Sequence, residues 1–207
     1  MTASTLLAAS TTESHRPDVR VATLSDRDRV VSTLVLAFAA DPVARWMYPD
    51  ADAYLAHFPR FVMAFGGRAL AHGTAHQAGD FAGAALWLPP GVHPDESALE
   101  DLLHATLPER TLGDVLGLLD EMDRYHPAEP HWHLPMIGVQ PARQGRGLGS
   151  ALLRHALAAC DRAGLAAHLE SSSPANIPLY ERHGFELRGT IRRGGSPPLF
   201  PMTRQPR

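Results

Sequence analysis

The sequence predicts one mixed α/β (α+β) domain built on a central sheet of about six or seven strands. Short runs with the two-residue period of strands alternate with runs of helical period. A glycine-rich turn at residues 145–149 joins a predicted strand to a predicted helix, and 207 residues that are 44% hydrophobic suffice to bury one core. We therefore expect the domain at residues 18–207, after a flexible, Ser- and Thr-rich tail at residues 1–17.

The first part of the domain predicts a strand, two helical regions and two further strands. Residues 18–24 alternate valine with polar residues, as in a half-buried strand. A helix follows, with Ser25 as its N-cap, and ends before Asp41-Pro42. The remaining elements of this part are a helical region at residues 42–48 and 53–65, broken or kinked at Pro59 and ended by Gly66-Gly67, and strands near residues 69–77 and 81–88.

The second part begins with a helical insertion at about residues 89–130. Pro89-Pro90-Gly91 ends the preceding strand, and the insertion carries helical patterns at residues 95–105 and 108–125. Strands and helices then alternate to the end of the chain. We expect strands at residues 131–139, 166–170, 185–190 and 199–203, and helices at residues 145–163 and 175–183.

The composition excludes several kinds of chemistry. All 19 basic residues are arginine, so a lysine-dependent phosphate loop, a protein-kinase site and a Schiff-base enzyme cannot be built. A net charge of −3 argues against nucleic acid and acidic membranes as partners. Cys160 has no disulfide partner and is expected in the core, apolar runs are too short for a membrane helix, and no basic start marks a secretory signal. We expect a cytoplasmic, bacterial protein.

The glycine-rich turn predicts an anion site. At a helix N-terminus the first amide groups have no intrahelical acceptor, and the helix dipole adds partial positive charge. Gly145, Gly147 and Gly149 remove side chains, so that a phosphate could approach these amides closely without any lysine. The alternative is a helix start that merely packs tightly and needs glycine for clearance.

Two linked motifs carry a family resemblance. Gln144-Gly-Arg-Gly-Leu-Gly149 matches Q/R-x-x-G-x-G/A, and Leu169-Glu-Ser-Ser-Ser is followed by Asn176-Ile-Pro-Leu-Tyr-Glu-Arg-His-Gly-Phe185. Together they resemble the GNAT superfamily of acetyl-CoA-dependent N-acetyltransferases. Within this superfamily, most of the chain is similar to puromycin N-acetyltransferase and its bacterial relatives. Further segments that carry this similarity are Val21-Ala-Thr, Pro127-Ala-Glu-Pro-His-Trp132 and Met202-Thr-Arg204.

The resemblance implies a sheet splayed between its fourth and fifth strands, with acetyl-CoA held in the wedge as co-substrate. Pro135 is unusual in the fourth strand, because proline has no N–H group to donate to a neighbouring strand. It fits a splay or a bulge of the sheet, or alternatively an irregular start of the strand. The resemblance implies a cofactor site made of Ile137, Gly138 and Val139 on the strand, Gln144, Gly145, Arg146, Gly147, Leu148, Gly149 and Ser150 around the pyrophosphate, with Arg143 or Arg146 near the nucleotide phosphates, and Asn176.

The resemblance also implies the catalytic groups. Tyr180, four residues after Asn176 on one helix face, would protonate the departing thiolate. Glu170, His133 or a water chain would take the proton of the amine, and Trp46 and Tyr48 precede the region that borders the acceptor pocket. Two histidine pairs, His131 with His133 and His72 with His76, have spacings that could suit metal ligands. Neither pair has an acidic or Cys partner at recognisable spacing, so we expect no metal.

The sequence therefore predicts an acetyl-CoA-dependent N-acetyltransferase that moves an acetyl group directly to a primary amine of a small molecule. One alternative is a non-catalytic CoA-binding sensor or interaction module of the same fold. Another is a nucleotide-binding protein of a different fold. The identity of the acceptor and the oligomeric state, a homodimer included, are left open.

Overall fold

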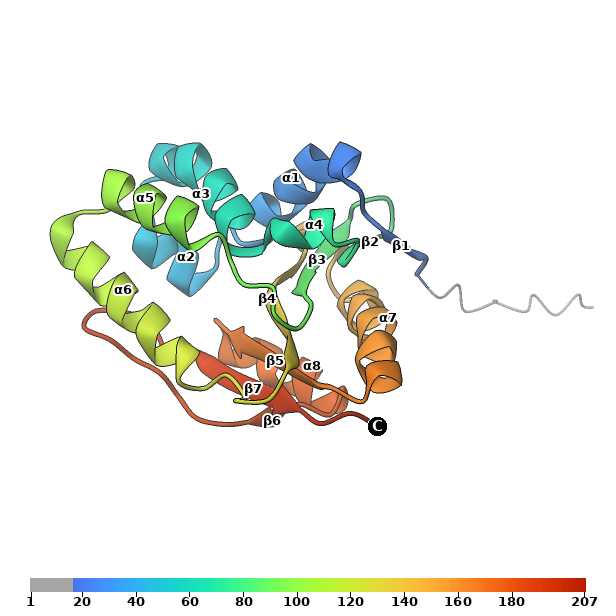
Figure 1. Ribbon diagram of the computed structural model, residues 1–207. Coiled ribbons are helices and arrows are strands. Elements are labelled where there is room, and N and C mark those ends of the chain that lie inside the picture. The colour runs from blue at the N-terminus through green and yellow to red at the C-terminus, as the bar shows by residue number, and fades with distance from the viewer. Residues whose placement is uncertain (1–16) are drawn as a thin grey trace, which may run out of the picture.

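A seven-stranded mixed sheet forms the centre of the molecule. The computed structural model describes residues 17–207, so the expected tail lies, apart from residue 17, outside the described residues (Figure 1). The strand order is β1-β2-β3-β4-β5-β7-β6. The strands are β1 (Val19–Val21), β2 (Ala75–Ala78), β3 (Gly83–Leu88), β4 (His131–Val139), β5 (Ala166–Ser171), β6 (Glu186–Leu187) and β7 (Phe200–Arg204).

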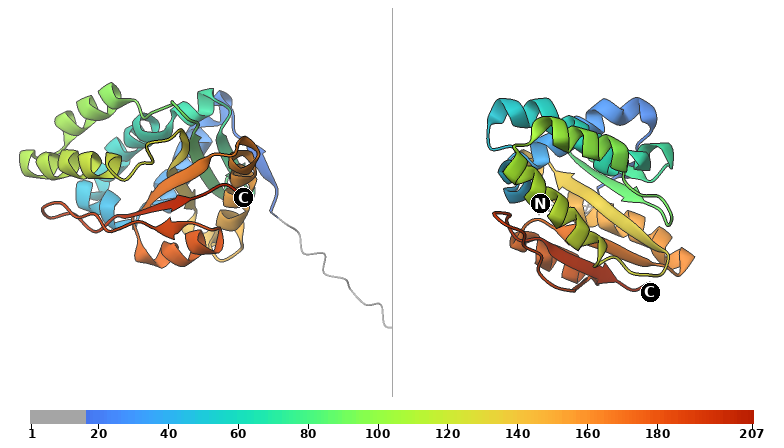
Figure 2. Two further views of the ribbon diagram at one scale, coloured as in Figure 1. Left: turned by 60° about the horizontal axis from the view of Figure 1, so that its bottom comes forward. Right: turned by 60° about the vertical axis from the view of Figure 1, so that its left-hand side comes forward.

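Helices cover both faces of this sheet, with α1 to α6 towards one side and α7 and α8 towards the other (Figure 1, Figure 2). They are α1 (Arg27–Ala37), α2 (Pro42–Met47), α3 (Ala51–Gly66), α4 (Arg68–Ala71), α5 (Glu96–Thr106), α6 (Glu109–Asp123), α7 (Leu148–Ala163) and α8 (Ile177–Arg182). The predicted fold class and the helical character of the insertion, which contains α5 and α6, are confirmed. None of the helices that the structure describes is long and apolar enough to cross a bilayer.

The sheet separates two hydrophobic cores, one on each of its faces, and strand β3 contributes side chains to both. It is buried along its whole length, and its side chains alternate between the cores. Leu86 and Leu88 pack with α1 and α3, whereas Ala85 and Trp87 pack with α7. Successive side chains of a strand point to opposite faces, so a nearly continuous apolar run is what a strand covered on both faces requires.

The sheet opens between β4 and β5. These strands are parallel and pair only from His131 to His133, opposite Ala166 to His168. Beyond His133 the edge of β4 that faces β5 has no strand partner. On its other edge, the register of β4 against β3 shifts between Leu86 and Leu88, beside Pro135. Proline has no N–H group to donate to a neighbouring strand. Its position at a register shift and at the opening of the sheet therefore agrees with the prediction of a splay or bulge there.

Three local predictions are wrong. Ser25 does not cap the first helix: a 3₁₀ turn, Leu24–Asp26, precedes α1, and the carboxylate of Asp26 accepts from the backbone N–H of Thr23 at 2.9 Å. Helix α3 runs through Pro59, so the expected break at this proline is absent. Residues 68–71 are the short helix α4, and the strand expected near residues 69–77 begins only at Ala75, after Gly73 has turned the chain with a φ of 67°.

A buried ion pair ties β7 to the far end of α7. The guanidinium of Arg204 donates to both carboxylate oxygens of Asp161 at 2.8 and 2.9 Å, and its Nε donates to the carbonyl of His183 at 3.0 Å. The Arg204 side chain is 4% exposed and that of Asp161 is 26% exposed. Hydrogen bonding by Arg204 lowers the pKa of Asp161, so the carboxylate is charged at neutral pH.

We expect Arg204→Met to lower the free energy of unfolding at pH 7 by about 2–3 kcal/mol, because it leaves a partly buried carboxylate unpaired. The stabilisation is present above the unfolded-state pKa of Asp, about 4, and is lost as the pH falls through the lower folded-state pKa. Urea unfolding at several pH values measures both effects. The control is Arg188→Met. It removes an exposed ion pair in which Arg188 lies 3.8 Å from Glu186, so the free energy of unfolding should change little. Equal losses in the two variants would contradict the assignment.

Candidate active site

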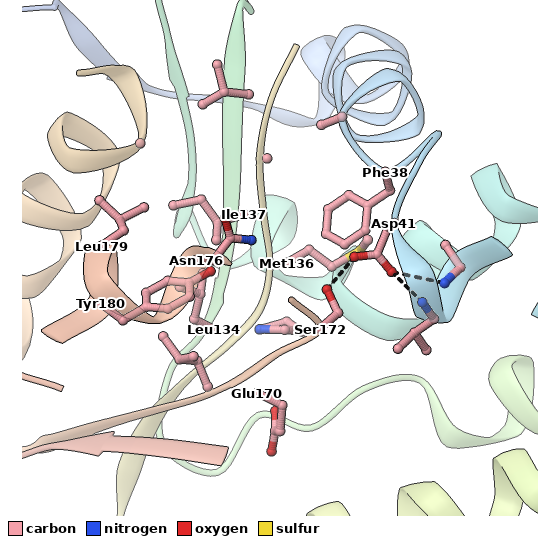
Figure 3. Close-up of a pocket in the computed structure, with 18 of the residues that line it drawn as sticks. Phe38, Asp41, Leu134, Met136, Ile137, Glu170, Ser172, Asn176, Leu179 and Tyr180 are labelled. Atoms are coloured by element: carbon pink, nitrogen blue, oxygen red, sulfur yellow. Dashed lines mark hydrogen bonds between the residues drawn. The ribbon is translucent and has the colours of Figure 1, made fainter. Parts of the chain in front are cut away.

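A cavity of about 540 Å³ lies in the wedge between β4 and β5 (Figure 3). One wall is β4 from Leu134 to Val139, and the facing elements supply Leu169, Asn176 and Tyr180. The start of α7 forms one end of the cavity, and residues of α1, α2, α3 and α6 form the other. The opening of the sheet therefore creates the space in which most of the predicted site residues meet.

The glycine turn faces open space. Gly145 and Gly147 have φ values of 74° and 77°, a left-handed conformation that favours glycine. A Cβ atom at either position would meet no protein atom within 4 Å. Clearance from neighbouring protein atoms is therefore not what requires these two glycines. Together with Gln144, Gly149 and Ser150 they line the cavity at the N-terminus of α7.

The amides at this helix start are suited to an anion. Gly147 precedes α7, and the N–H of Ala151 donates to the carbonyl of Gly147 at 2.9 Å. The amides of Leu148, Gly149 and Ser150 come before that first turn is closed and have no intrahelical acceptor. The guanidinium-bearing residue Arg143 also lines the cavity, whereas Arg146 is exposed and does not.

The strand wall offers backbone groups. Ile137, Gly138 and Val139 line the cavity on the part of β4 that β5 has left. Gly138 also has a packing role, because a Cβ atom there would lie 2.5 Å from the Cβ of Ala37. The side-chain amide of Gln144 donates to the carbonyl of Val139 at 3.2 Å and so connects the turn to the end of the strand.

Tyr180 and Asn176 line the same cavity, as their spacing predicted (Figure 3). Asn176 ends a 3₁₀ turn, Pro174–Asn176, and Tyr180 lies one turn later on α8, with 6% of its surface exposed. Burial, and to a smaller extent the charge of Asp41, raise the pKa of the phenol. Tyr180 is therefore protonated at neutral pH, as a proton donor must be.

Glu170 and His133, the two predicted base candidates, are in contact. The His133 Nε2 and Glu170 Oε2 atoms are 3.2 Å apart, at the point where β4 and β5 separate. Glu170 lines the cavity, but its carboxylate points away from Tyr180 (Figure 3). Burial raises the pKa of Glu170, yet hydrogen bonds with His126, His133 and His168 outweigh burial and hold this pKa well below its usual value.

Sequence reasoning missed two of these imidazoles. His168 Nε2 lies 2.9 Å from Glu170 Oε1, and His126 Nε2 lies 3.3 Å from the same oxygen. Glu170 is the acidic neighbour of His133 that spacing along the chain did not reveal. The other histidine pair weighed from the sequence is arranged differently: His72 follows α4, and His76 is buried in β2 with its ring centroid 4.8 Å from that of His155.

The far end of the cavity is apolar with one carboxylate. Phe38, Phe58, Phe61 and Phe65 line it, as do Met47 and, from α6, Val115, Leu118, Leu119 and Met122. Asp41 points into this end, where its Oδ2 accepts a hydrogen bond from the Ser172 hydroxyl (Figure 3). Its Oδ1 accepts from the amides of Val43 and Ala44, both at 3.0 Å, and caps α2. Neither Asp41 nor Ser172 was predicted.

The two aromatic residues expected near the acceptor pocket are not part of the cavity lining. Tyr48 is 2% exposed, and its hydroxyl lies 3.0 Å from that of Thr106. Trp46 packs at the edge of the core that contains α1 to α6, whereas the intervening Met47 lines the cavity. Cys160 is buried in α7, as predicted for a core thiol.

Comparisons with known proteins agree with this geometry. Residues 37–185 match the model of the acetyltransferase (GNAT) family. An uncharacterised N-acetyltransferase of Schizosaccharomyces pombe is 32% identical over 200 residues, which cover 87% of this chain and 80% of that protein.

Solved structures show the same fold. A protein of Corynebacterium glutamicum described as histone acetyltransferase HPA2 and related acetyltransferase is 28% identical and superposes with a TM-score of 0.66, over 92% of this chain and 97% of that one. Arylalkylamine N-acetyltransferase 2 of Aedes aegypti, 15% identical, has a TM-score of 0.66 over 92% of this chain and 99% of its own. An agmatine N-acetyltransferase variant, 15% identical, has a TM-score of 0.63 over 91% and 99%. With 149 consecutive residues matched by the family model, the chain belongs to the GNAT acetyltransferase family.

Proposed function

We propose that this protein is an acetyl-CoA-dependent N-acetyltransferase that acetylates a primary amine of a small molecule by direct transfer. The observation that carries the proposal is that one cavity joins an anion-binding helix start, an unpaired strand edge, a buried tyrosine and two carboxylate residues. The puromycin N-acetyltransferase-like subgroup and a cytoplasmic setting remain part of this proposal, and a homodimer stays open.

The residues present fit acetyl-CoA, which supplies the acetyl group as a thioester. The amides around Gly147 and the side chain of Arg143 would hold the pyrophosphate, because the space in front of the turn is free of protein atoms. Backbone groups of Ile137 to Val139 would hydrogen-bond the pantetheine arm. Asn176 would bind the same arm from α8.

The chain's own groups would then move two protons. Burial lowers the pKa of His133, so its imidazole is neutral at pH 7, and the Glu170–His133 pair would take the proton of the ammonium group and free the nitrogen lone pair to attack the acetyl carbon. The Tyr180 hydroxyl gives a proton to the sulfur as the carbon–sulfur bond breaks. Carboxylate geometry of this kind tightens when substrate binds, so the present orientation of Glu170 is compatible with the role. Holding amine and thioester together supplies much of the rate gain.

The acceptor end of the cavity favours an amine with apolar and cationic parts. Four phenylalanines and several methionine and leucine side chains would hold a hydrocarbon or aromatic portion. Asp41 adds a negative charge that attracts a second positive group. Two proteins of similar fold are named for the acetylation of agmatine and of arylalkylamines, which supports a small-molecule amine as the class of acceptor.

We expect the wild-type protein to release free CoA thiol from acetyl-CoA in the presence of members of a panel of small primary amines. Tyr180→Phe removes one oxygen and keeps the buried ring, so it should lower kcat roughly 10²-fold or more with little change in acetyl-CoA affinity. Thiol detection measures turnover, and calorimetry measures binding. Undiminished turnover in the variant would remove Tyr180 from the acid role. Tight acetyl-CoA binding without turnover on any amine would favour the sensor alternative.

A charge introduced at the glycine turn tests the phosphate site. Gly147→Asp and Gly147→Asn are matched, because both side chains tolerate positive φ and differ in charge rather than size. We expect the Asp variant to bind acetyl-CoA about tenfold more weakly than the Asn variant, since a carboxylate would repel the pyrophosphate. Calorimetric titration measures the two dissociation constants. Equal constants would place the phosphates elsewhere.

Asp41→Asn tests the recognition of a second charge. An asparagine oxygen can still cap α2, so the fold should be kept. We expect KM for a diamine to rise roughly 3- to 10-fold and KM for a monoamine of the same length to change little, because only the diamine loses a charge pair. Steady-state kinetics with the two substrates measure the difference. A parallel change for both would show that Asp41 acts through the helix cap instead.

A further inference from the structure

We infer that His126, His133 and Glu170 form a binding site for a divalent transition-metal ion, with Zn²⁺ as the best match. One ligand atom from each residue lies within 4.8 Å of the others. Two imidazoles and one carboxylate are a recurrent ligand set for zinc sites that keep a fourth position open. This site shares Glu170 and His133 with the proposed base, but its existence does not depend on that catalytic role.

Each imidazole lies close to one oxygen of the carboxylate. His126 Nε2 is 3.3 Å from Glu170 Oε1, and His133 Nε2 is 3.2 Å from Glu170 Oε2. Adjacent ligands in a tetrahedral site with bonds of 2.0–2.1 Å are separated by about 3.3 Å. Both imidazoles approach the carboxylate with Nε2, the nitrogen that would bind the ion. The two imidazoles face different oxygens of Glu170, so a bound ion would either contact both carboxylate oxygens or require one imidazole to move.

The contacts of His131 indicate how hydrogens can be arranged beside Glu170. His131 Nδ1 lies 2.9 Å from the carbonyl of Glu129, which can only accept, so this nitrogen carries a hydrogen. His126 Nδ1 lies 3.0 Å from His131 Nε2, and His126 Nε2 faces Glu170. Three hydrogens are needed to complete this series of contacts, and two neutral rings supply two. A metal ion bound to His126 Nε2 would complete the series without a third hydrogen.

Neighbouring residues hold the ligands in place. With a hydrogen on its Nδ1 towards His131, 3.0 Å away, His126 keeps the lone pair of Nε2 free to bind a metal. His168, which is fully buried, lies 2.9 Å from Glu170 Oε1, and its other nitrogen lies 3.0 Å from the Thr203 hydroxyl. Partners of this kind orient the first ligands of metal sites and raise their affinity.

Burial and access also suit a metal. The side chains of Glu170 and His133 are 3% and 8% exposed, so a bound ion would be shielded from competing water. The His126 side chain is 23% exposed and offers a route from solvent. His126 lies between α6 and β4, whereas Glu170 lies on β5. A bound ion would therefore fasten the end of the helical insertion to the opening of the sheet.

The test is direct binding by the full chain without acetyl-CoA or amine. After treatment with a chelator, we expect one Zn²⁺ to bind per chain in competition with a chromophoric chelator, and Co²⁺ to give the visible absorption of a four-coordinate site. His126→Ala changes a partly exposed loop residue and should weaken Zn²⁺ binding roughly tenfold or more. The control is His104→Ala. It removes an exposed histidine that lies 3.8 Å from Glu100, and this variant should bind Zn²⁺ with the affinity of the wild type.

Two results would overturn the site: no saturable binding of one Zn²⁺ by the wild type, or equal affinity in the wild type and His126→Ala. A second readout rests on the proposed function. Because the ion would occupy the Glu170–His133 base, Zn²⁺ should inhibit acetyl transfer by the wild type, and His126→Ala should need roughly tenfold more Zn²⁺ for the same fractional inhibition. Zinc binding without any transferase activity would contradict the proposed function alone and leave the metal site standing.

Discussion

The site depends on one constraint, the short pairing of β4 with β5. The two parallel strands share three residue pairs and then separate, so six residues of β4 face a cavity instead of a strand. Backbone groups left this way must find other partners, which a ligand with amide groups can provide. Helix α7 connects the two strands, so its N-terminus opens into the same gap. Pro135 sits where the separation begins and has no donor to lose.

Features set by nearby residues could be predicted from the sequence. The glycine turn, the strand before it and the helix after it lie within one continuous segment, and Asn176 and Tyr180 are one helical turn apart. The nearly continuous apolar run that predicts the central strand β3 also lies within one short segment. Two of the wrong predictions concern places where the local sequence permits more than one structure. One is the helix start, which has several capping residues around Ser25, and the other is residues 69–77, where Gly73 permits a turn that divides a helix from a strand.

Features set by distant residues could not be predicted. Asp41 and Ser172 are 131 positions apart and meet only because α2 packs beside the end of β5. His126 belongs to an irregular segment that has no period to place it, yet it contacts Glu170 on another element. The only signal in the sequence was the density of histidine near residues 126–133 and at residue 168, together with Glu170. Spacing along the chain does not reveal such a cluster, because parallel strands bring it together.

The buried carboxylate of Glu170 needs a positive charge or hydrogen-bond donors beside it, and either protons on the imidazoles or a metal ion can supply this. Removing Glu170 from water costs free energy, and hydrogen bonds from the surrounding imidazoles offset that cost. Nε2 of His126 faces the same carboxylate, so a hydrogen on that nitrogen and the proposed metal ion would occupy one position. A proton there keeps Glu170 and His133 available to the amine, whereas an ion would bind both. If both proposals hold, a bound ion and proton transfer by Glu170 and His133 would exclude each other.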